Sequence, residues 1–241
     1  LLMHHDDDHR ERVTGTSAGL KAVRCEVDTF GEHPDADWRL TLGAEGVSRL
    51  DGPAGTPSLE WRTPMPGRHS ALNASAAAIL AIRLGVPGDR IAGGLERFPG
   101  VERRMEFLGR RRVRDGHVEV VDDYGHHPTE CRATLGALRR RHRPRRLLCI
   151  FQPHQHSRTR FLLDRFAESF DEADLVLVPD IHFVRDSEEE RRRVSSGDLV
   201  DRLRARGIAA THLPTTPEIL ACLEATAAPG DLVVSMGAGP V

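Results

Sequence analysis

The chain has 241 residues, of which 34 are Lys or Arg and 36 are Asp or Glu, so its formal net charge is -2. A balance this close to neutrality argues against a protein that binds nucleic acid or a membrane surface through its bulk charge. Hydrophobic residues make up 39% of the chain, and the 22 glycines bring the total close to the roughly 45–50% of soluble globular domains. This length has room for two domains, each with its own core.

The four cysteines, Cys25, Cys131, Cys149 and Cys222, lie far apart and show neither the spacing of a disulfide framework nor that of a zinc site. We expect reduced thiols in a cytoplasmic protein. No apolar run approaches the ~20 residues that span a bilayer. The first residue is Leu1, with neither a basic segment nor a signal-like apolar segment after it, so we expect a segment cut from a longer protein.

The first hundred residues predict short strands followed by two helices. Short β-rich pieces alternate with turn residues and are interpreted as edge strands, at 23–30, 38–42 and 59–62. Apolar residues then recur at helical spacing up to Gly85, which is expected to stop the helix, and a second helix is expected over 88–97. The segment 98–100, Phe-Pro-Gly, breaks the chain and marks a domain boundary near residue 100.

Beyond this boundary strands and helices alternate, which predicts a Rossmann-like α/β fold, a mostly parallel sheet with flanking helices. The expected strands are short apolar runs, at 118–122, 147–151, 175–179 and 232–236. The expected helices lie between them, at 129–142, 159–171, 196–206 and 217–227. In an open sheet of this kind, ligands bind at the carboxyl ends of the strands.

Two polar clusters follow the first two of these strands. The segment DDYGHHP occupies 122–128, and QPHQHSR occupies 152–158. We interpret the two strands as neighbours in the sheet, so that both clusters face one crevice. Arg and His side chains donate hydrogen bonds to carboxylate and phosphate oxygens, and the clusters therefore predict an anionic substrate.

Three other features are interpreted as structural. The run HHDDDH at 4–9 could ligate a metal but reads as a hydrophilic surface turn, and no metal site is predicted. The run RRRHRPRR at 139–146 spans an expected helix C-terminus, where the helix dipole stabilises cations. Gly237 and Gly239 follow an apolar strand, and a tight turn explains them as well as a close approach to a ligand does.

Several motifs occur in the order found in the Mur ligases, a family of ATP-dependent amide ligases. They are PGRH at 66–69 with Asn73, GVERR at 100–104, DDYGHHPTE at 122–130, FQPH at 151–154 and MGAG at 236–239. With these motifs the chain most resembles the branch of the family that joins L-alanine to UDP-N-acetylmuramate. The alternatives are a branch that adds another amino acid or a peptide, and a non-catalytic protein that binds a nucleotide or a UDP-sugar.

The resemblance implies that residues 1–100 are the C-terminal part of a central ATP-binding domain, and that residues 101–241 are most of the C-terminal domain that binds the amino acid. The implied partners are ATP, UDP-N-acetylmuramate and L-alanine, with Mg²⁺ as cofactor, and the amide forms through an acyl phosphate. Most Mg²⁺ ligands and the P-loop are then missing. Lys21 is the only lysine, and its segment at 15–22 fails the P-loop spacing, so the isolated chain is expected to be inactive. The oligomeric state is not indicated.

For ATP, the resemblance implies contacts by three residues. Asn73 matches the position that contacts the base, Arg104 the position that holds ATP, and Asp123 the position on the ribose side. We expect Arg104 and Asp123 to approach ATP from opposite sides of the domain boundary. Two departures from the family pattern bear on this region, because Ser70 replaces the usual Asn and Pro240 the usual Asp.

For the pocket where acyl group and amino acid meet, the resemblance implies four lining residues, Tyr124, His126, His154 and Arg158. We assign catalysis to His126, His154 and Arg158. Arg158 is expected to bind a carboxylate or the acyl phosphate, because a planar guanidinium holds such oxygens with two parallel hydrogen bonds. Either histidine is a candidate to take the proton of the alanine ammonium. Gln155 stands where the family commonly has an arginine, which leaves one cation fewer.

Overall fold

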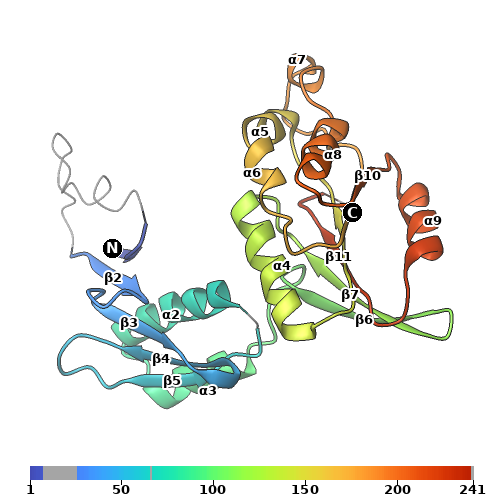
Figure 1. The fold of residues 1–241 in the computed structure, drawn as a ribbon. Helices are drawn as coiled ribbons and strands as arrows, with labels where there is room; N and C mark the ends of the chain where they lie inside the picture. Colours follow the sequence, from blue (N-terminus) through green and yellow to red (C-terminus); the bar gives the residue numbers. More distant parts are fainter. Residues whose placement is uncertain (8–25, 66, 240–241) are drawn as a thin grey trace. The chain divides into compact units, whose positions relative to one another are not determined.

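The computed structural model describes residues 1–7, 26–65 and 67–239 (Figure 1). The chain divides into two compact units, Leu1–Pro99 and Gly100–Val241, and each has its own sheet and its own buried core. Some residues of the sequence-based expectations lie outside the described residues: Asp8, His9, Lys21 with its segment at 15–22, residues 23–25, Pro66 and Pro240.

The first unit contains a sheet of five strands in chain order, β1 (Leu2–His4), β2 (Asp28–Gly31), β3 (Trp38–Leu42), β4 (Val47–Asp51) and β5 (Leu59–Arg62). The first three strands run parallel, and β3, β4 and β5 are antiparallel neighbours. The strands predicted at 38–42 and 59–62 are confirmed, whereas β4 was not predicted. Because β4 covers one side of β3 and β2 the other, the interpretation of 38–42 as an edge strand was wrong.

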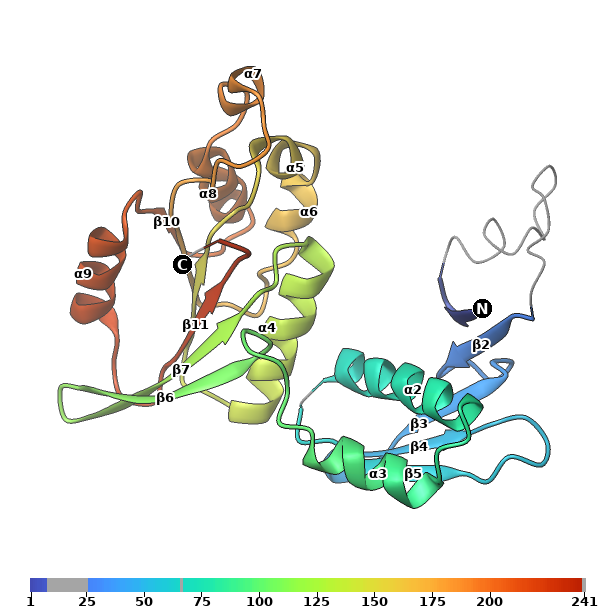
Figure 2. The same cartoon turned by 180° about the vertical axis from the view of Figure 1, so that it is seen from behind.

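Helices α2 (Arg68–Arg83) and α3 (Gly88–Arg97) pack against this sheet, as Figure 2 shows. Burial alternates along β3, where Trp38 and Leu40 are each 2% exposed and their neighbours face solvent. These side chains form one core with residues of the other strands and both helices, namely Leu50, Leu59, Trp61, Ala71, Ala78, Ile79 and Ile91. The helix α2 ends before Gly85, whose φ of +80° favours glycine, as predicted.

The interpretation of residues 4–9 as a surface turn was wrong for the first residue of the segment, His4. His4 belongs to β1 and lies opposite Phe30 in the parallel register, so the segment begins inside the sheet. His5 is half-buried and stacks on His33 with ring centroids 4.3 Å apart. Within the described residues, no group of three or more His, Cys, Asp or Glu side chains is arranged to hold a metal ion.

The second unit contains a six-stranded sheet in the order β10-β9-β8-β11-β7-β6, with every neighbouring pair parallel except the β6–β7 hairpin. The bounds are β6 (Glu106–Val113), β7 (Gly116–Asp123), β8 (Leu147–Phe151), β9 (Leu175–Val178), β10 (Ala210–His212) and β11 (Leu232–Met236). The α/β class and the four predicted strands are confirmed. The expectation that the first two of them are neighbours was wrong, because β11 lies between β7 and β8.

Six helices accompany this sheet in the described residues: α4 (Pro128–His142), α5 (His156–Phe161), α6 (Leu163–Ala167), α7 (Glu188–Arg191), α8 (Ser196–Ala205) and α9 (Thr216–Thr226). The helix predicted over 159–171 was wrong as one element, since it begins earlier and is interrupted at Leu162. In this segment Phe166 and Phe170 are buried, whereas Phe161 is 73% exposed. No helix in the described ranges is both long and apolar enough to cross a membrane.

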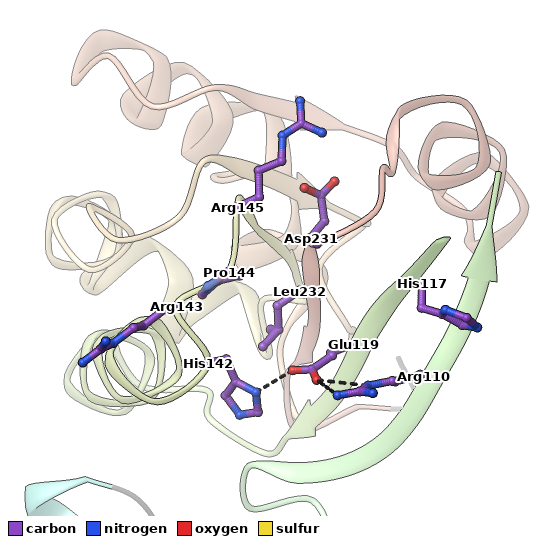
Figure 3. Close-up of a pocket in the computed structure, with 10 residues that line it drawn as sticks. Arg110, His117, Glu119, His142, Arg143, Pro144, Arg145, Asp231 and Leu232 are labelled. Atoms are coloured by element: carbon purple, nitrogen blue, oxygen red, sulfur yellow. Dashed lines mark hydrogen bonds and ion pairs between the residues drawn. The ribbon is translucent and has the colours of Figure 1, made fainter. Parts of the chain in front are cut away.

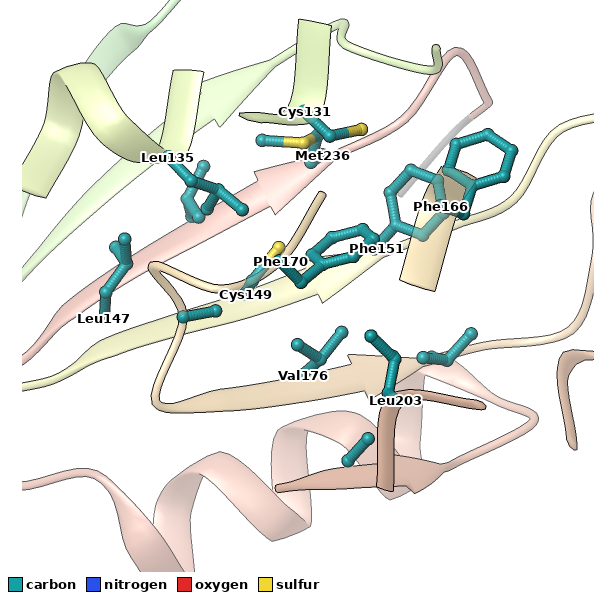
Figure 4. Close-up of a cluster of buried hydrophobic side chains, with 14 of the residues drawn as sticks. Cys131, Leu135, Leu147, Cys149, Phe151, Phe166, Phe170, Val176, Leu203 and Met236 are labelled. Atoms are coloured by element: carbon teal, nitrogen blue, oxygen red, sulfur yellow. The ribbon is translucent and has the colours of Figure 1, made fainter. Parts of the chain in front are cut away.

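Successive residues of the central strands serve two different cores, because side chains alternate across a sheet. On one face, Leu147, Cys149 and Phe151 pack with residues of α4, β11 and α8 (Figure 4). On the other face, Leu148 packs with Val233 and with the Leu223 side chain of α9. Cys131 and Cys149 are buried free thiols and Cys222 is a half-buried one, which agrees with the expected reduced state of these three residues.

Candidate functional site

Three loops meet at the carboxyl edge of the second sheet, following β7, β8 and β11. His126 follows β7 and His154 follows β8, and their ring centroids lie 6.2 Å apart although the two strands are not neighbours. The loop after β11 between them contains Gly239. A Cβ there would collide with the Gln152 side chain and would lie 3.3 Å from Cγ of His182. The clusters at 122–128 and 152–158 therefore lie close together, as predicted, with the loop of Gly239 between their strands.

Asp123 at the end of β7 is a buried anchor of this edge, with 3% of its surface exposed. Its Oδ2 accepts a hydrogen bond from Met105 N at 2.9 Å, and its Oδ1 accepts from Gly125 N at 2.8 Å and Thr134 Oγ1 at 3.3 Å. Burial raises the pKa of this carboxyl above its ordinary value, although the hydrogen bonds and the charge of Arg104 oppose the shift. In this structure Asp123 holds the loop together and does not face solvent.

Two arginines approach the ring of Tyr124, and both belong to the second unit. The guanidinium carbons of Arg103 and Arg104 lie 5.3 and 5.5 Å from the ring centroid. Arg103 also pairs with Asp122 at 2.9 Å and donates to the Gly237 carbonyl at 2.8 Å. Arg104 is more open, with 44% of its side chain exposed. Because Arg104 lies in the same unit as Asp123, the expectation that they stand on opposite sides of the domain boundary was wrong.

The start of α4 fixes the orientation of His126. His127 is the N-cap residue, and its ring accepts a hydrogen bond from Thr129 N at 3.3 Å. Glu130 Oε2 accepts the backbone N–H groups of His126 and His127 at 3.0 and 3.2 Å, which completes a capping box. The ring nitrogen Nδ1 of His126 lies 3.0 Å from the Tyr124 carbonyl oxygen. His127 is thus occupied at the helix terminus, while His126 presents its ring toward His154.

His154 has the environment of a neutral imidazole. Its ring is half-buried and stacks on His182 with centroids 5.4 Å apart, and its Nδ1 is buried without a hydrogen-bond partner in the described part of the chain. Burial lowers the pKa of His154, and the positive charges of Arg158, His182, His126 and Arg185 lower it further. A neutral ring with an unoccupied nitrogen is able to accept a proton.

Arg158 lies on α5 beside this ring and is half-buried. Its guanidinium forms no hydrogen bond or ion pair with the residues that the structure describes. The preceding Gln155 is the N-cap of α5, with a φ of +68° that is rare for a residue other than glycine. Asn73 lies exposed on α2 in the first unit, so the structure does not place it relative to these residues.

The sequence analysis missed the loop after β9. His182 pairs with His154 in an isolated parallel bridge, its N–H donates to the Pro153 carbonyl at 2.8 Å, and its own carbonyl accepts from Gln155 N at 3.1 Å. Asp186 accepts the backbone N–H groups of His156 and Ser157 and so starts α5. A signal was present, because these polar residues follow the third predicted strand at the same edge of the sheet.

A cavity of about 400 Å³ lies elsewhere, at the amino ends of β8 and β11 (Figure 3). In it Glu119 pairs with His142 at 2.6 Å and with Arg110 at 3.1 Å. Of the basic run at 139–146, Arg139 pairs with Asp174 and Arg146 with the buried Asp231. The structural interpretation of this run therefore holds for these pairs. The cavity is separate from the histidine site, which consists of His126, His154 and Arg158 at the carboxyl edge of the sheet.

Comparisons with known proteins agree with the motifs. The family model "Mur ligase, glutamate ligase domain" matches residues 103–239. The UDP-N-acetylmuramate--L-alanine ligase of Desulfitobacterium hafniense (strain Y51) is 34% identical, over 100% of this chain and 51% of that protein. The ligase of the same name from Anaeromyxobacter sp. (strain Fw109-5) is 38% identical, over 92% of this chain and 48% of that protein.

Among solved structures, a murein peptide ligase from Psychrobacter arcticus 273-4 shares the fold with a TM-score of 0.71 at 23% identity, covering 99% of this chain and 48% of its own. The chain spans about half the length of the curated relatives that it matches. The match of the family model to most of the second unit, together with these relatives, shows that the chain belongs to the Mur ligase family.

Proposed function

We propose that this chain supplies part of an ATP-dependent ligase that joins L-alanine to UDP-N-acetylmuramate in peptidoglycan precursor synthesis. The observation that carries the proposal is the histidine site itself. Within the described residues, His154 Nδ1 and the guanidinium of Arg158 have no hydrogen-bond partner, the pKa of His154 is lowered, and its ring lies beside that of His126. Relatives that carry the name of this ligase support the choice of substrates.

The chemistry of amide formation fits these residues. The alanine amine attacks the acyl carbon of the activated carboxyl group, and phosphate leaves with the electrons of the broken C–O bond. The ammonium group of alanine must lose a proton before its nitrogen can attack, and we assign the acceptance of this proton to the neutral His154. Arg158 binds an anionic group of the reactants, and His126 orients them beside the ring.

The nucleotide part of the proposal rests on fewer residues. Arg104 and Asn73 are the proposed ATP contacts, since both are exposed. Asp123 uses its carboxylate oxygens within the unit, and we propose that it serves ATP by fixing Met105 and hence the adjacent Arg104. The described residues contain no cluster suited to a metal ion, so we propose that the Mg²⁺ that accompanies ATP is held outside them.

We also propose which domain of this ligase each of the two units represents. Residues 1–100 would be the end of the central ATP-binding domain, and residues 101–241 most of the amino-acid-binding domain. A cytoplasmic location follows as a proposal from the soluble substrates. Because no lysine besides Lys21 is present, the isolated chain should release no phosphate from ATP when UDP-N-acetylmuramate and L-alanine are added. Substrate-dependent release above that of a boiled sample would contradict this.

The test of the site is Arg158→Lys in the complete ligase, with phosphate release measured as a function of L-alanine. An ammonium cannot reproduce two parallel hydrogen bonds, so turnover should fall about tenfold to a hundredfold, while the melting temperature stays unchanged. The matched control is Arg165→Lys, at an exposed arginine of α6.

If Arg158→Lys keeps its activity and instead melts earlier, Arg158 is structural and the site is wrongly assigned. The wild type should also be tested with a panel of amino acids. A clear preference for one other than alanine would move the chain to another branch of the family.

A further inference from the structure

We propose that Arg185 is a second anion-binding residue of this site and that, with Arg158, it binds the carboxylate of the incoming amino acid. This inference rests on the proposed function, because it names the part of the substrate that this side of the histidine site recognises. Arg185 lies in the loop between β9 and α7, a segment outside the motifs of the sequence.

The loop that contains Arg185 is attached to the loop after β8 by backbone hydrogen bonds. His182 N donates to the Pro153 carbonyl at 2.8 Å, and Gln155 N donates to the His182 carbonyl at 3.1 Å. These bonds continue the pairing of β8 with β9 past the ends of both strands. The position of the loop relative to His154 is therefore set by the sheet.

Arg185 lies between two anchored residues of this loop. On one side, His182 stacks on the His154 ring with an interplanar angle of 28°. On the other side, the carboxylate of Asp186 holds the first N–H groups of α5, the helix that carries Arg158. Arg185 itself has a φ of +52°, a conformation that few residues other than glycine adopt unless neighbouring contacts impose it. Its positive charge acts on the His154 ring, which agrees with this placement.

Within the described residues, neither Arg158 nor Arg185 has a hydrogen bond or ion pair of its guanidinium. The carboxylates nearby in the sequence are engaged, Asp186 by the N-terminus of α5 and Asp180 by His212 Nε2 at 2.8 Å. Two guanidinium groups that have no partner in the described residues, and whose positive charges act on the His154 ring, form a site for an oxyanion.

The carboxylate of the amino acid fits this oxyanion best. Its carbon is bonded to the same Cα as the reacting amine, so an amine that faces His154 places the carboxylate beside the same ring. The guanidinium groups that act on this ring are those of Arg158 and Arg185. A phosphate oxygen of the activated intermediate presents similar chemistry, and the experiment below separates the two.

The experiment compares Arg185→Ala with wild type in the complete ligase, using L-alanine and L-alaninamide, which lacks the carboxylate. We expect the KM for L-alanine to rise about tenfold to a hundredfold, as for a lost charge-assisted hydrogen bond, and the turnover of L-alaninamide to match that of wild type. The melting temperature should not change. Arg192→Ala is the matched control, since Arg192 is an exposed arginine farther along the same connection.

Three outcomes would overturn the assignment. An equal fall of kcat with both substrates would show that Arg185 serves the phosphate of the intermediate. Unchanged kinetics with both substrates would remove Arg185 from the site. An equal rise of the KM for L-alanine in Arg192→Ala would show that the effect comes from general surface charge. If wild type prefers another amino acid, the proposed function fails for alanine, and the same comparison with that amino acid and its amide still tests Arg185.

Discussion

Replacing Asp123 with Asn tests whether this residue acts first as a structural anchor. The substitution keeps the shape of the side chain but replaces one acceptor oxygen with an NH₂ group. If Oδ1 continues to accept from Gly125 N and Thr134 Oγ1, the new NH₂ group faces Met105 N, which is also a donor. The Met105 N–H then loses its partner in a part-buried position.

The cost follows from this count of hydrogen bonds. A buried donor left without a partner costs about 1–3 kcal/mol, and removal of a desolvated charge offsets part of it. We therefore expect Asp123→Asn to lower the free energy of unfolding of the second unit by about 1–3 kcal/mol at pH 7. Asp123→Ala should cost more, because it also frees the Gly125 N–H. Asp115→Asn, in the exposed turn of the β6–β7 hairpin, is the matched control.

The pH dependence has a defined sign. Burial raises the pKa of Asp123 in the folded state above 3.8, so the folded state binds the proton more tightly than the unfolded state. Its contribution to stability is full below about pH 3.8 and is lost as the pH rises through the folded pKa. Relative to Asp123→Asn, wild type should thus gain stability as the pH is lowered from 7 toward 4.

Urea unfolding should be followed by circular dichroism, because both tryptophans, Trp38 and Trp61, lie in the first unit and their fluorescence would not report on the second. If Asp123→Asn matches wild type within about 0.5 kcal/mol at every pH between 4 and 7, the reasoning on these hydrogen bonds is refuted. Unchanged stability combined with a raised KM for ATP would instead favour a direct contact with the nucleotide.

Two further predictions concern groups buried in the second unit. Arg146→Ala removes the ion-pair partner of Asp231, whose side chain is fully buried, and should lower the free energy of unfolding by about 3–5 kcal/mol in urea. The control Arg145→Ala, at an exposed neighbour, should change this free energy by less than about 0.5 kcal/mol. Equal effects of the two substitutions would contradict the explanation from the buried Asp231 charge. Burial raises the pKa of the fully buried Cys149 thiol, so a thiol-alkylating reagent should modify Cys149 only when the protein unfolds. The half-buried Cys222 should react in the folded protein, and mass spectrometry distinguishes the two sites. Labelling of both cysteines at the same rate would contradict the buried core described here.

The strands that could be predicted are those whose own short run of residues is apolar, so that the run alone indicates a buried strand. The strand β8 is apolar along its full length, and β11 is apolar except for Ser235, because both faces of the sheet are covered; their predicted bounds were correct. The strand β6 was missed because it lies at the sheet edge and is mostly exposed, so its arginines at 110–112 have no apolar alternation. Strand order depends on contacts between distant segments and could not be derived.

The same distinction applies to the candidate site. His126, His154 and Arg158 could be predicted because each follows a recognisable strand closely and lies in or beside a motif. The positions of His182 and Arg185 beside this site could not be predicted, since they arise from the pairing of two loops beyond the strand ends. Arg104 is exposed, and its relation to Asp123 could not be predicted because it depends on the antiparallel hairpin of β6 and β7.

The central position of β11 has a consequence for how the second unit forms during synthesis. Val234 lies opposite both Val121 of β7 and Cys149 of β8, so the last strand among the described residues joins two parts that are otherwise not paired. Until this strand leaves the ribosome, β7 and β8 each present an open edge, and such edges invite pairing with other chains. A nascent chain should therefore resist proteolysis only once residues 232–236 have emerged, and a stop codon before Leu232 should produce aggregation.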